Sequence, residues 1–123
     1  MTMRILVLSA ALLVPLAAQA ASVKQGTTDK GPVLTDDKGM TLYTFDKDEM
    51  GKSACVDACA QNWPPLLADK GAAAMGEYSL VTRPDGAMQW AYRGKPLYLW
   101  VKDMKPGDTT GDGVKDVWHV ARP

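Results

Sequence analysis

Hydrophobic and polar positions alternate through most of the chain after residue 30, and turns rich in glycine, proline and aspartate separate the short apolar runs. An alternation with a period of two is typical of β-strands that bury one face. It predicts strands at 32–35, 40–45, 78–82, 87–92, 96–101 and 117–120. The segments between them have the composition of hairpin turns at 36–39, 84–86 and 93–95. The fold is therefore expected to be mainly β.

One segment, Ser53 to Gln61, has the pattern of a short helix. Ser53 is a favourable N-cap residue, and alanines follow at positions 54, 58 and 60. The helix is expected to stop at Asn62, because the sequence Trp63-Pro64-Pro65 follows it. This is the one helix that the pattern predicts.

A line of ten residues occurs twice in the chain, 55 positions apart. The segment Gly39 to Asp48 reads GMTLYTFDKD, and the segment Gly94 to Asp103 reads GKPLYLWVKD. The same offset continues without a gap over residues 31–67 and 86–122. A repeat of this length is one supersecondary unit that buries its apolar face against its neighbour. We therefore expect a small single domain of two tandem β-hairpin-based repeats with pseudo-twofold symmetry.

Within the first copy of this line, alternation places Leu42, Thr44 and Asp46 on one face and Tyr43, Phe45 and Lys47 on the other. The second copy is apolar on both faces, which is typical of a buried strand. We therefore expect the second copy to be the more buried strand and the first to lie nearer an edge. The offset also relates Trp63 to Trp118, and these two residues are expected to occupy equivalent core sites.

The first twenty residues have the pattern of a secretory signal peptide. Arg4 precedes the apolar run Ile5 to Ala18, and Ala18-Gln19-Ala20 is a small-x-small cleavage site. The apolar run is shorter than the roughly 20 residues that cross a bilayer, and no cysteine near the cut could accept a lipid. The predicted product is a periplasmic or secreted protein cut after Ala20. Residues 21–30 are predicted to be a flexible leader, and 31–123 the folded domain.

Charge and motif content exclude several function classes. The chain has 14 basic and 14 acidic residues, and both signs are interspersed along it. No basic block indicates binding to nucleic acid or to an anionic membrane. Nucleophile elbows, phosphate loops and dinucleotide motifs are absent as well. No catalytic signature is found, and a protein that is not an enzyme is expected.

The most specific pattern is an aromatic motif that ends in aspartate and occurs once in each repeat. Its residues are Tyr43, Phe45 and Asp48 in the first copy and Tyr98, Trp100 and Asp103 in the second. In a structural interpretation, which we favour, the aromatic side chains fill a β core and each aspartate accepts backbone hydrogen bonds. In a functional interpretation, the two tyrosines line a ligand groove between the repeats, with the aspartates at its mouth. The sequence leaves both open.

The chain has two cysteines, Cys55 and Cys59. In an exported protein a lone pair is most simply a disulfide. Because residues four apart on a regular helix hold their Cβ atoms too far apart for a disulfide, a bridged segment must be distorted. The alternative is metal or thiol chemistry, in which reduced cysteines and His119 bind Cu(I) with nearby methionines. The candidates are Met40, Met50, Met75, Met88 and Met104.

The segment Asp108 to Asp116 resembles the first part of a calcium-binding loop. Oxygen side chains fall at the ligand positions occupied by Asp108, Thr110, Asp112 and Asp116, and Gly113 stands where the loop turns sharply. His119 replaces the expected bidentate glutamate, and no helix pattern flanks the loop. A turn whose aspartates cap local backbone is an equal alternative.

Together these segments resemble a family of bacterial secreted repeats and lipoproteins named for the Tyr-x-(Phe/Trp/Tyr)-x-x-Asp motif and described as a secreted repeat of unknown function. The resemblance covers nearly the whole mature chain and includes Gly39 to Asp48, Ser53 to Leu66, Gly94 to Asp103, Gly107-Asp108 and Trp118 to Val120. It implies an extracytoplasmic protein of paired repeats and no established activity, cofactor or substrate. The chain differs from lipidated members in lacking the N-terminal cysteine.

We therefore expect a non-enzymatic binding or interaction module of the cell envelope, with an envelope protein or a small ligand as its partner. Its site would lie where the two aromatic motifs meet. Two alternatives remain open. One is a copper-handling or redox accessory protein that uses Cys55, Cys59 and His119, and the other is a module stabilised by calcium at Asp108, Thr110, Asp112 and Asp116.

Overall fold

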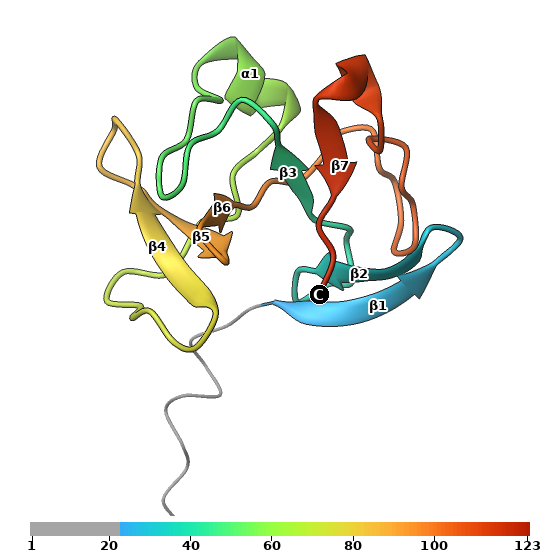
Figure 1. Cartoon of the computed structure of the whole chain (residues 1–123), viewed down its shortest axis with the longest axis horizontal. Coiled ribbons are helices and arrows are strands. Elements are labelled where there is room, and N and C mark those ends of the chain that lie inside the picture. The colour runs from blue at the N-terminus through green and yellow to red at the C-terminus, as the bar shows by residue number, and fades with distance from the viewer. Residues whose placement is uncertain (1–22) are drawn as a thin grey trace, which may run out of the picture.

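The computed structural model describes residues 23–123, so the predicted signal peptide lies outside the described residues. Most of its regular elements are short β-strands (Figure 1). In chain order they are β1 (Lys24–Thr28), β2 (Gly31–Thr35), β3 (Tyr43–Phe45), α1 (Ala58–Asn62), β4 (Tyr78–Thr82), β5 (Met88–Tyr92), β6 (Lys95–Pro96), the 3₁₀ turn η2 (Val114–Asp116) and β7 (Trp118–Val120). They form the antiparallel sheets β1-β2, β3-β7 and β4-β5-β6. The expected mainly β fold with one short helix is confirmed.

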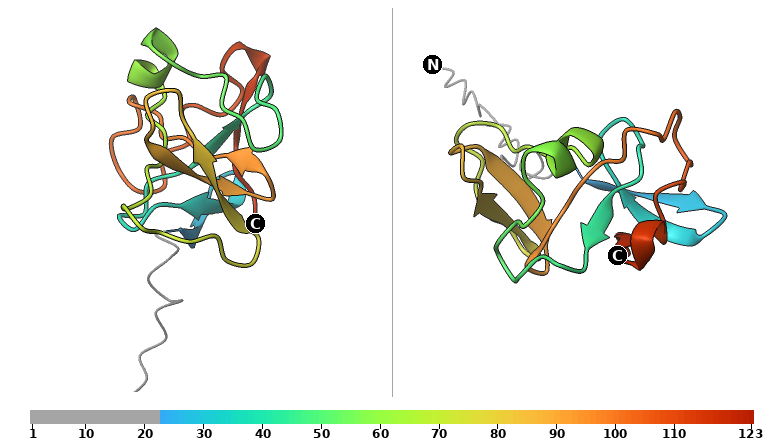
Figure 2. Two further views of the ribbon diagram at one scale, coloured as in Figure 1. Left: turned by 90° about the vertical axis from the view of Figure 1, so that its left-hand side faces the viewer. Right: turned by 90° about the horizontal axis from the view of Figure 1, so that it is seen from above.

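The two repeats are arranged about a pseudo-twofold axis. The hairpins β1-β2 and β4-β5 lie at opposite ends of the molecule (Figure 1; Figure 2, right). At the centre, Tyr43 and Tyr98 face each other as an antiparallel bridge. The Tyr43 amide donates to the Tyr98 carbonyl at 2.8 Å, and the Tyr98 amide donates to the Tyr43 carbonyl at 3.0 Å. The axis therefore passes between these two equivalent residues.

Each repeat completes the other through its last segment. Strand β7, from the end of the second repeat, pairs with β3 of the first, with Tyr43 opposite Val120. The equivalent segment at the end of the first repeat forms a bridge between Pro65 and Tyr98 in the second. Neither repeat thus contains all the strands of its own half of the molecule.

The correspondence between the repeats contains a shift of one residue in β2 and β5. In each half, three residues are joined in a ring by backbone hydrogen bonds: Leu34, Ala121 and Leu42 in one, and Trp90, Leu66 and Leu97 in the other. Ala121 and Leu42 lie 55 positions from their counterparts, whereas Leu34 and Trp90 are 56 apart. The turn between β4 and β5 is one residue longer than the turn between β1 and β2, and the loop that follows β5 is one residue shorter than the loop that follows β2. The expected gapless alignment is wrong in this segment.

The segment expected to be a flexible leader, residues 21–30, contains strand β1. All five residues of Lys24–Thr28 pair with β2, which fills the hydrogen-bonding edge of a strand whose Val33 and Leu34 are buried. The side chains of β1 are largely exposed, so its polar sequence suits an edge strand. The sequence pattern did not predict β1, because its polar residues show no apolar period of two.

The regular elements are shorter than expected. The helix spans Ala58–Asn62 and not Ser53 to Gln61, because Asp57 has a φ of 54° and breaks the helical path before it. The strands expected at 40–45 and 96–101 shorten to β3 and β6. The segments that were expected to be longer strands continue as single bridges and turns around the axis.

The expectation that the second copy of the repeated line is the more buried is wrong. Equivalent positions over residues 41–47 and 96–102 have the same exposure in both halves, because the pseudo-twofold axis gives them equivalent surroundings. Asp46 is exposed, and its apolar counterpart Val101 is 47% exposed. The apolar character of the second copy on this face therefore does not reflect burial.

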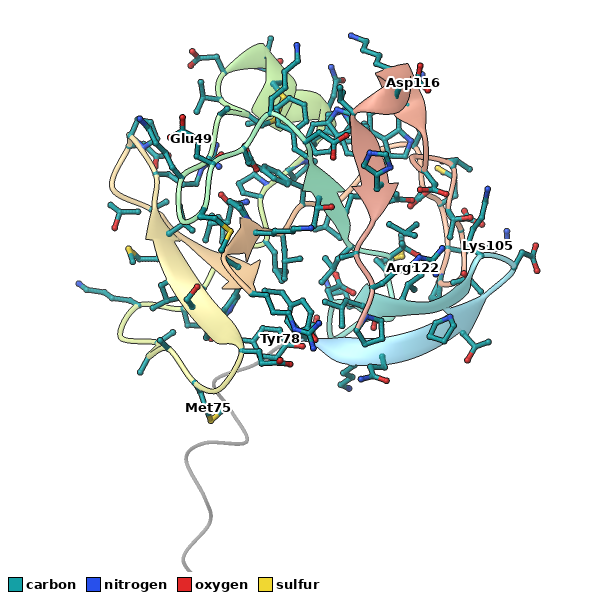
Figure 3. All side chains as sticks on the ribbon, in the orientation of Figure 1. Glu49, Met75, Tyr78, Lys105, Asp116 and Arg122 are labelled. Carbon is teal, nitrogen blue, oxygen red and sulfur yellow. A yellow bond between two sulfur atoms is a disulfide. The ribbon has the colours of Figure 1, made fainter. Side chains whose placement is uncertain are left out.

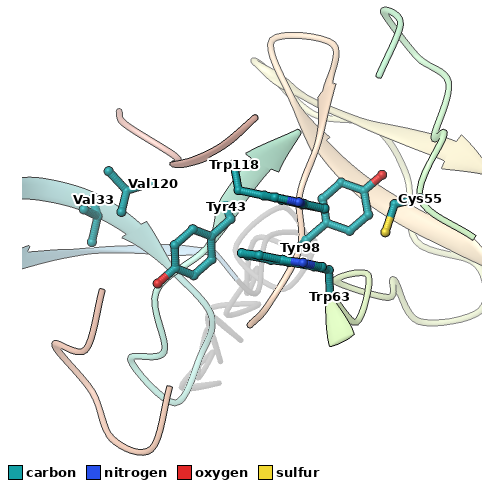
Figure 4. Packing of buried hydrophobic residues seen from close by; sticks show 7 residues of the cluster. All are labelled: Val33, Tyr43, Cys55, Trp63, Tyr98, Trp118 and Val120. Carbon is teal, nitrogen blue, oxygen red and sulfur yellow. The ribbon is translucent and has the colours of Figure 1, made fainter. Parts of the chain in front are cut away.

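Two apolar clusters make up the core. One surrounds the axis and consists of Val33, Tyr43, Cys55, Trp63, Tyr98, Trp118 and Val120 (Figure 4). The other contains Leu34, Leu42, Leu66, Trp90, Tyr92, Leu97 and Ala121. Trp63 and Trp118 lie in the first cluster with 5% and 2% of their surface exposed, so their equivalent core placement is confirmed. Each such side chain contributes roughly 1.5–3 kcal/mol on burial.

Candidate functional site

The tyrosine and aspartate of the repeated motif bind across the axis. The Tyr43 hydroxyl donates to Oδ2 of Asp103 at 2.5 Å, and the Tyr98 hydroxyl donates to Oδ2 of Asp48 at 2.7 Å. Each tyrosine therefore binds the aspartate of the other repeat and not its own. Both tyrosine side chains are fully buried, so the structure does not place them along an open groove.

The second oxygen of each aspartate fixes a neighbouring loop. Oδ1 of Asp103 accepts hydrogen bonds from the backbone amide of Thr110 at 3.0 Å and from its hydroxyl at 2.6 Å. Oδ1 of Asp48 accepts from the amide of Ala54 at 2.6 Å. The carboxylates thus hold both a tyrosine and a loop, as the structural interpretation of the motif requires.

Burial changes the acid–base behaviour of these groups. It raises the pKa of Tyr43, and the hydrogen bond to Asp103 raises that pKa further. Burial also raises the pKa of Tyr98. The pKa of Asp48 is raised by burial, although hydrogen bonds from Ala54 and Tyr98 act in the opposite direction. The two phenols therefore remain protonated donors at neutral pH.

A buried arginine, which the sequence pattern did not indicate, supports the hydrogen-bonded pair Tyr98 and Asp48. Arg83 is only 6% exposed, and its Nη1 donates to Oε1 of Gln89 at 2.7 Å and to the Ser53 hydroxyl at 3.1 Å. Its Nη2 donates to the Cys55 carbonyl at 2.8 Å. Ser53, expected as a helix cap, instead lies 2.6 Å from the Tyr98 hydroxyl. An arginine after a strand and before Pro84 looks like an ordinary turn residue, so sequence pattern could not identify it.

Four aromatic rings form a continuous stack at the axis, in the order Phe45, Trp118, Trp63, Trp100. The successive centroid distances are 4.2, 3.8 and 3.9 Å. The pseudo-twofold axis exchanges the two central rings with each other and the two outer rings with each other. The buried tyrosines meet the central rings edge-on, Tyr43 against Trp63 and Tyr98 against Trp118 (Figure 4). Stacked and edge-on pairs each add roughly 0.5–1.5 kcal/mol beyond burial.

Gly111 allows the chain to pass against this stack. A Cβ at this position would lie 2.8 Å from the Trp63 ring and 2.9 Å from the Tyr43 ring. Its amide also donates to the Tyr43 hydroxyl at 3.3 Å. Gly111 lies within the segment that resembles a calcium-binding loop, and its role in the structure is to make room for the rings.

One side of the stack opens into a hollow of about 350 Å³, which we call the aromatic groove. It lies between α1, β3 and the η2-β7 segment, the elements at the top of Figure 1. Its aromatic lining comes from Phe45, Trp63 and Trp118, and it is also lined by the exposed Lys47 and Lys115. The outer ring of the stack that faces this groove is Phe45 of the first motif.

Strained backbone borders the aromatic groove at two places. Asp57, just before α1, has φ 54° and ψ −122°, and Lys115 in η2 has φ 52°. Non-glycine residues in such regions cost energy of order 1–3 kcal/mol each and tend to occur at binding sites. Asp57 precedes α1 and Lys115 lies in η2, and residues of α1 and η2 both line the aromatic groove.

A second hollow, of about 360 Å³, lies against the other face of β3. We call it the basic pocket, because its charged lining residues are mainly cationic. They are Asp46, Arg93, Lys95, His119 and Arg122. Thr44 and Asp46 line this pocket whereas Phe45 and Lys47 line the aromatic groove, which confirms the alternation expected for the strand.

The two cysteines form a disulfide, Cys55–Cys59, with their Cα atoms 5.2 Å apart. The bridged segment is distorted at Asp57, as expected for this spacing. The sulfurs are therefore not available as thiolate ligands in this state. His119 instead pairs with Asp46, with 2.7 Å between Nε2 and Oδ2. Within residues 23–123, no three His, Cys, Asp or Glu side chains are grouped to hold a metal ion.

The residues of the calcium-loop pattern are engaged separately. Asp108 binds the amides of Met104 and Lys105 and the Lys105 ammonium. Asp112 accepts from the Val120 amide at 3.0 Å and lies 3.6 Å from Nζ of Lys30. Asp116 projects from η2 at the top of the molecule (Figure 3). The structure does not bring these carboxylates together, and Asp108 and Asp112 instead bind backbone amides.

Comparison with known proteins gives one finding. A family model described as a secreted repeat of unknown function matches residues 24–67 and again residues 79–122. Each matched copy includes the first strand of its hairpin, β1 or β4, which the sequence pattern had left outside the repeats. Comparison with the curated proteins and with the solved structures gives no match. None of the helices in the described part of the chain is long and apolar enough to cross a membrane.

Proposed function

The chain belongs to the family of secreted repeats of unknown function, and from that premise we propose that it is an exported, non-enzymatic binding module of the cell envelope. The observation that carries the proposal is the aromatic groove. It combines the partly exposed ring of Phe45, the edges of the nearly buried Trp63 and Trp118, and two lysines. A groove with an apolar lining and a few polar groups is the usual form of a small-molecule site.

The hydrogen bonds of the motif support a binding role over a catalytic one. Within the motif, the side chains with acid–base capacity bind one another across the axis: Tyr43 binds Asp103, and Tyr98 binds Asp48. A general acid or base must reach the substrate within hydrogen-bonding distance. The two buried hydroxyls and the carboxylates that accept from them are already occupied by structural partners.

The disulfide and the family description support export. Disulfides form and persist in oxidising compartments such as the bacterial periplasm. Cys55–Cys59 fixes the segment that leads into α1, one wall of the aromatic groove. A periplasmic location, with cleavage after Ala20, therefore agrees with a structure that uses a disulfide near its site.

The lining of the aromatic groove favours a ligand with a flat apolar face and one negative charge. The ring edges of Phe45, Trp63 and Trp118 supply the apolar contact. Lys47 and Lys115 lie on the lining, and within residues 23–123 neither takes part in an ion pair. An aromatic or cyclic carboxylate, free or at the end of an envelope component, has the complementary chemistry.

The ligand class can be tested with benzoate and its neutral analogue benzamide. In ¹H–¹⁵N correlation spectra, benzoate should shift the indole signals of Trp63 and Trp118 more strongly than benzamide does. Replacing both groove lysines, Lys47→Gln with Lys115→Gln, should weaken benzoate binding about fivefold, because each exposed pair contributes about 0.5 kcal/mol.

Lys102→Gln is the matched control, since Lys102 is the counterpart of Lys47 in the second repeat and lies outside the groove. It should leave benzoate binding unchanged. Equal binding of benzoate and benzamide, or equal weakening by the control, would contradict the proposed site.

The compartment can be tested by intact mass spectrometry of protein purified from the periplasm. The expected chain begins at Ala21 and is two hydrogens lighter than its reduced form. A chain found only in the cytoplasm with both thiols reduced would contradict export.

A further inference from the structure

We propose that the basic pocket is a second binding site, which takes a phosphoryl oxyanion independently of the aromatic groove. The pocket is formed where β7 and the end of the chain approach the β5-β6 turn. Arg93 and Lys95 contribute from that turn, and His119 and Arg122 from β7 and the residues after it.

Both arginines are held in position by the protein while keeping free donor capacity. Nε of Arg93 donates to Oε1 of Glu77 at 2.9 Å, and its guanidinium lies 4.9 Å from the centre of the Tyr92 ring. Nη1 of Arg122 donates to the carbonyls of Lys30 and Pro32 at 2.7 and 3.2 Å. A guanidinium has five N–H donors, so each arginine retains donors for a ligand. Figure 3 shows Arg122 near the C-terminal end of β7.

The charge of the pocket is unbalanced. Arg93, Lys95 and Arg122 carry three positive charges, and His119 adds a fourth when it is protonated. Asp46 is the acidic residue of the lining, and Glu77 offsets Arg93 from outside it. The remaining excess is positive, in a chain whose basic and acidic residues are equal in number. An anionic group therefore complements it.

The pseudo-twofold axis provides an internal comparison for this pocket. Four of its polar residues, from β3 and from β7 and the chain after it, have apolar counterparts in the other half: Leu99 for Thr44, Val101 for Asp46, Pro64 for His119 and Leu67 for Arg122, whereas Arg93 corresponds to the charged Lys38. The backbone around them is built in the same way, since Pro65 pairs with Tyr98 as Val120 pairs with Tyr43. The fold therefore does not require polar or charged side chains at these four positions, and their presence in the basic pocket favours a role of the pocket in binding.

The arrangement of donors favours phosphate over carboxylate. Cationic groups come from the β5-β6 turn at Arg93, from Lys95 in β6 and from Arg122 beyond the end of β7, and His119 adds a ring nitrogen from the middle of β7. A tetrahedral phosphoryl group presents oxygens in several directions, whereas a carboxylate presents two in one plane. A volume of about 360 Å³ accommodates such a group and part of the molecule that carries it.

The test is calorimetric titration of the whole mature protein with inorganic pyrophosphate at low ionic strength. We expect saturable binding of one pyrophosphate per chain, and weaker binding of succinate, a dianion whose two charged groups are planar carboxylates. Arg122→Leu, which introduces the residue found at the counterpart position, should weaken pyrophosphate binding about five- to tenfold. Asp46→Asn removes the acidic group and should strengthen it.

Two controls separate this site from general charge effects and from the aromatic groove. Lys102→Gln removes a cation outside the pocket, and Lys47→Gln removes one from the groove, and both should leave pyrophosphate binding unchanged. Thermal unfolding of each variant shows that it is folded. Because Asp46→Asn should act in the opposite direction from Arg122→Leu, simple loss of stability cannot imitate the result.

The source of the phosphoryl group is decided by a second arm with vesicles of phosphatidylglycerol, and of phosphatidylcholine as a control. Binding to phosphatidylglycerol that Arg122→Leu weakens and Asp46→Asn strengthens would support the site and assign it to lipid headgroups. Pyrophosphate binding without vesicle binding would assign it to soluble phosphates. The proposal is overturned if neither probe binds, or if the Arg122 and Asp46 variants bind as the unchanged protein does.

Discussion

At the scale of single residues, the hydrogen bonds from tyrosine to aspartate show how the repeated motif works. Tyr43 and Tyr98 each donate to the aspartate of the other repeat; the bond from Tyr43 is buried, and the bond from Tyr98 is partly buried. A buried hydroxyl left without an acceptor costs about 1–3 kcal/mol. The motif therefore stabilises the association of the two halves as well as each half.

The crossed pairing can be tested with double-mutant cycles followed by urea denaturation. Tyr43→Phe combined with Asp103→Ala should show a coupling energy of about 1–2 kcal/mol, because the two side chains share a hydrogen bond. Tyr43→Phe combined with Asp48→Ala should be additive, since Tyr43 does not bind the aspartate of its own repeat. Coupling to Asp48 and not to Asp103 would show that the pairing lies within each repeat.

The raised pKa values of Tyr43 and Tyr98 predict a loss of stability at alkaline pH. The ordinary pKa of tyrosine is 10.0, and burial raises the pKa of both phenols above it in the folded chain. Above pH 10 the unfolded chain therefore loses phenol protons that the folded chain keeps. The contribution is fully present below pH 10 and falls by about 1.4 kcal/mol per pH unit for each tyrosine above it.

Tyr43→Phe should reduce this alkaline slope by about 1.4 kcal/mol per pH unit. The measurement is the free energy of unfolding in urea between pH 9 and pH 11, on the variant and the unchanged protein. An identical slope in both would mean that the Tyr43 phenol is accessible to solvent in the folded state.

At the scale of elements, β3 separates two surfaces of different chemistry. Its alternating side chains place Phe45 and Lys47 in the aromatic groove and Thr44 and Asp46 in the basic pocket. The alternation was readable in the sequence. The surfaces themselves were not, because β7 contributes to each from residues more than seventy positions away.

The disulfide joins Cys55, which precedes α1, to Cys59 in the first turn of α1. Cys55→Ala with Cys59→Ala should lower the free energy of unfolding by about 2 kcal/mol, because the bridge closes a short loop in the unfolded chain. The helix has only five residues and should lose protection from hydrogen exchange first. Adding a reductant to the unchanged protein should produce the same loss, and should have no effect on the variant. Full unfolding in reductant would show that the bridge supports more than this segment.

At the scale of the whole molecule, the exchange of terminal segments makes the two repeats interdependent. Strand β7 completes the first half, and Pro65 near the end of the first repeat completes the second. The aromatic stack alternates in the same way, since Phe45 lies on Trp118 and Trp100 lies on Trp63. The domain therefore behaves as a single cooperative unit.

This interdependence predicts that fragments 23–75 and 76–123 are unfolded alone and fold when mixed. Each fragment lacks the partner strand and the partner rings of its own half, so it cannot bury its apolar surface. Near-ultraviolet circular dichroism of the stacked tryptophans, absent from each fragment, should return on mixing. A monomeric fragment with a cooperative thermal transition of its own would contradict the exchange.

The sequence by itself determined the mainly β class, the duplication and the alternation of faces in β3, and it favoured the disulfide. These properties depend on residue types and on spacing within one copy. It failed at β1, whose polar residues carry no apolar period, and at the one-residue shift, because a longer turn and a shorter loop cancel in the alignment.

Only the tertiary structure decided which copy each motif residue contacts. Spacing is the same in both repeats, so it cannot distinguish pairing within a copy from pairing across the axis. Packing makes that choice. Trp63 stacks on Trp118, and the two repeats meet at Tyr43 and Tyr98, so that each tyrosine hydroxyl binds the aspartate of the other repeat. The burial of Arg83 and the two hollows beside β3 arise from the same packing, between residues that are distant in the chain.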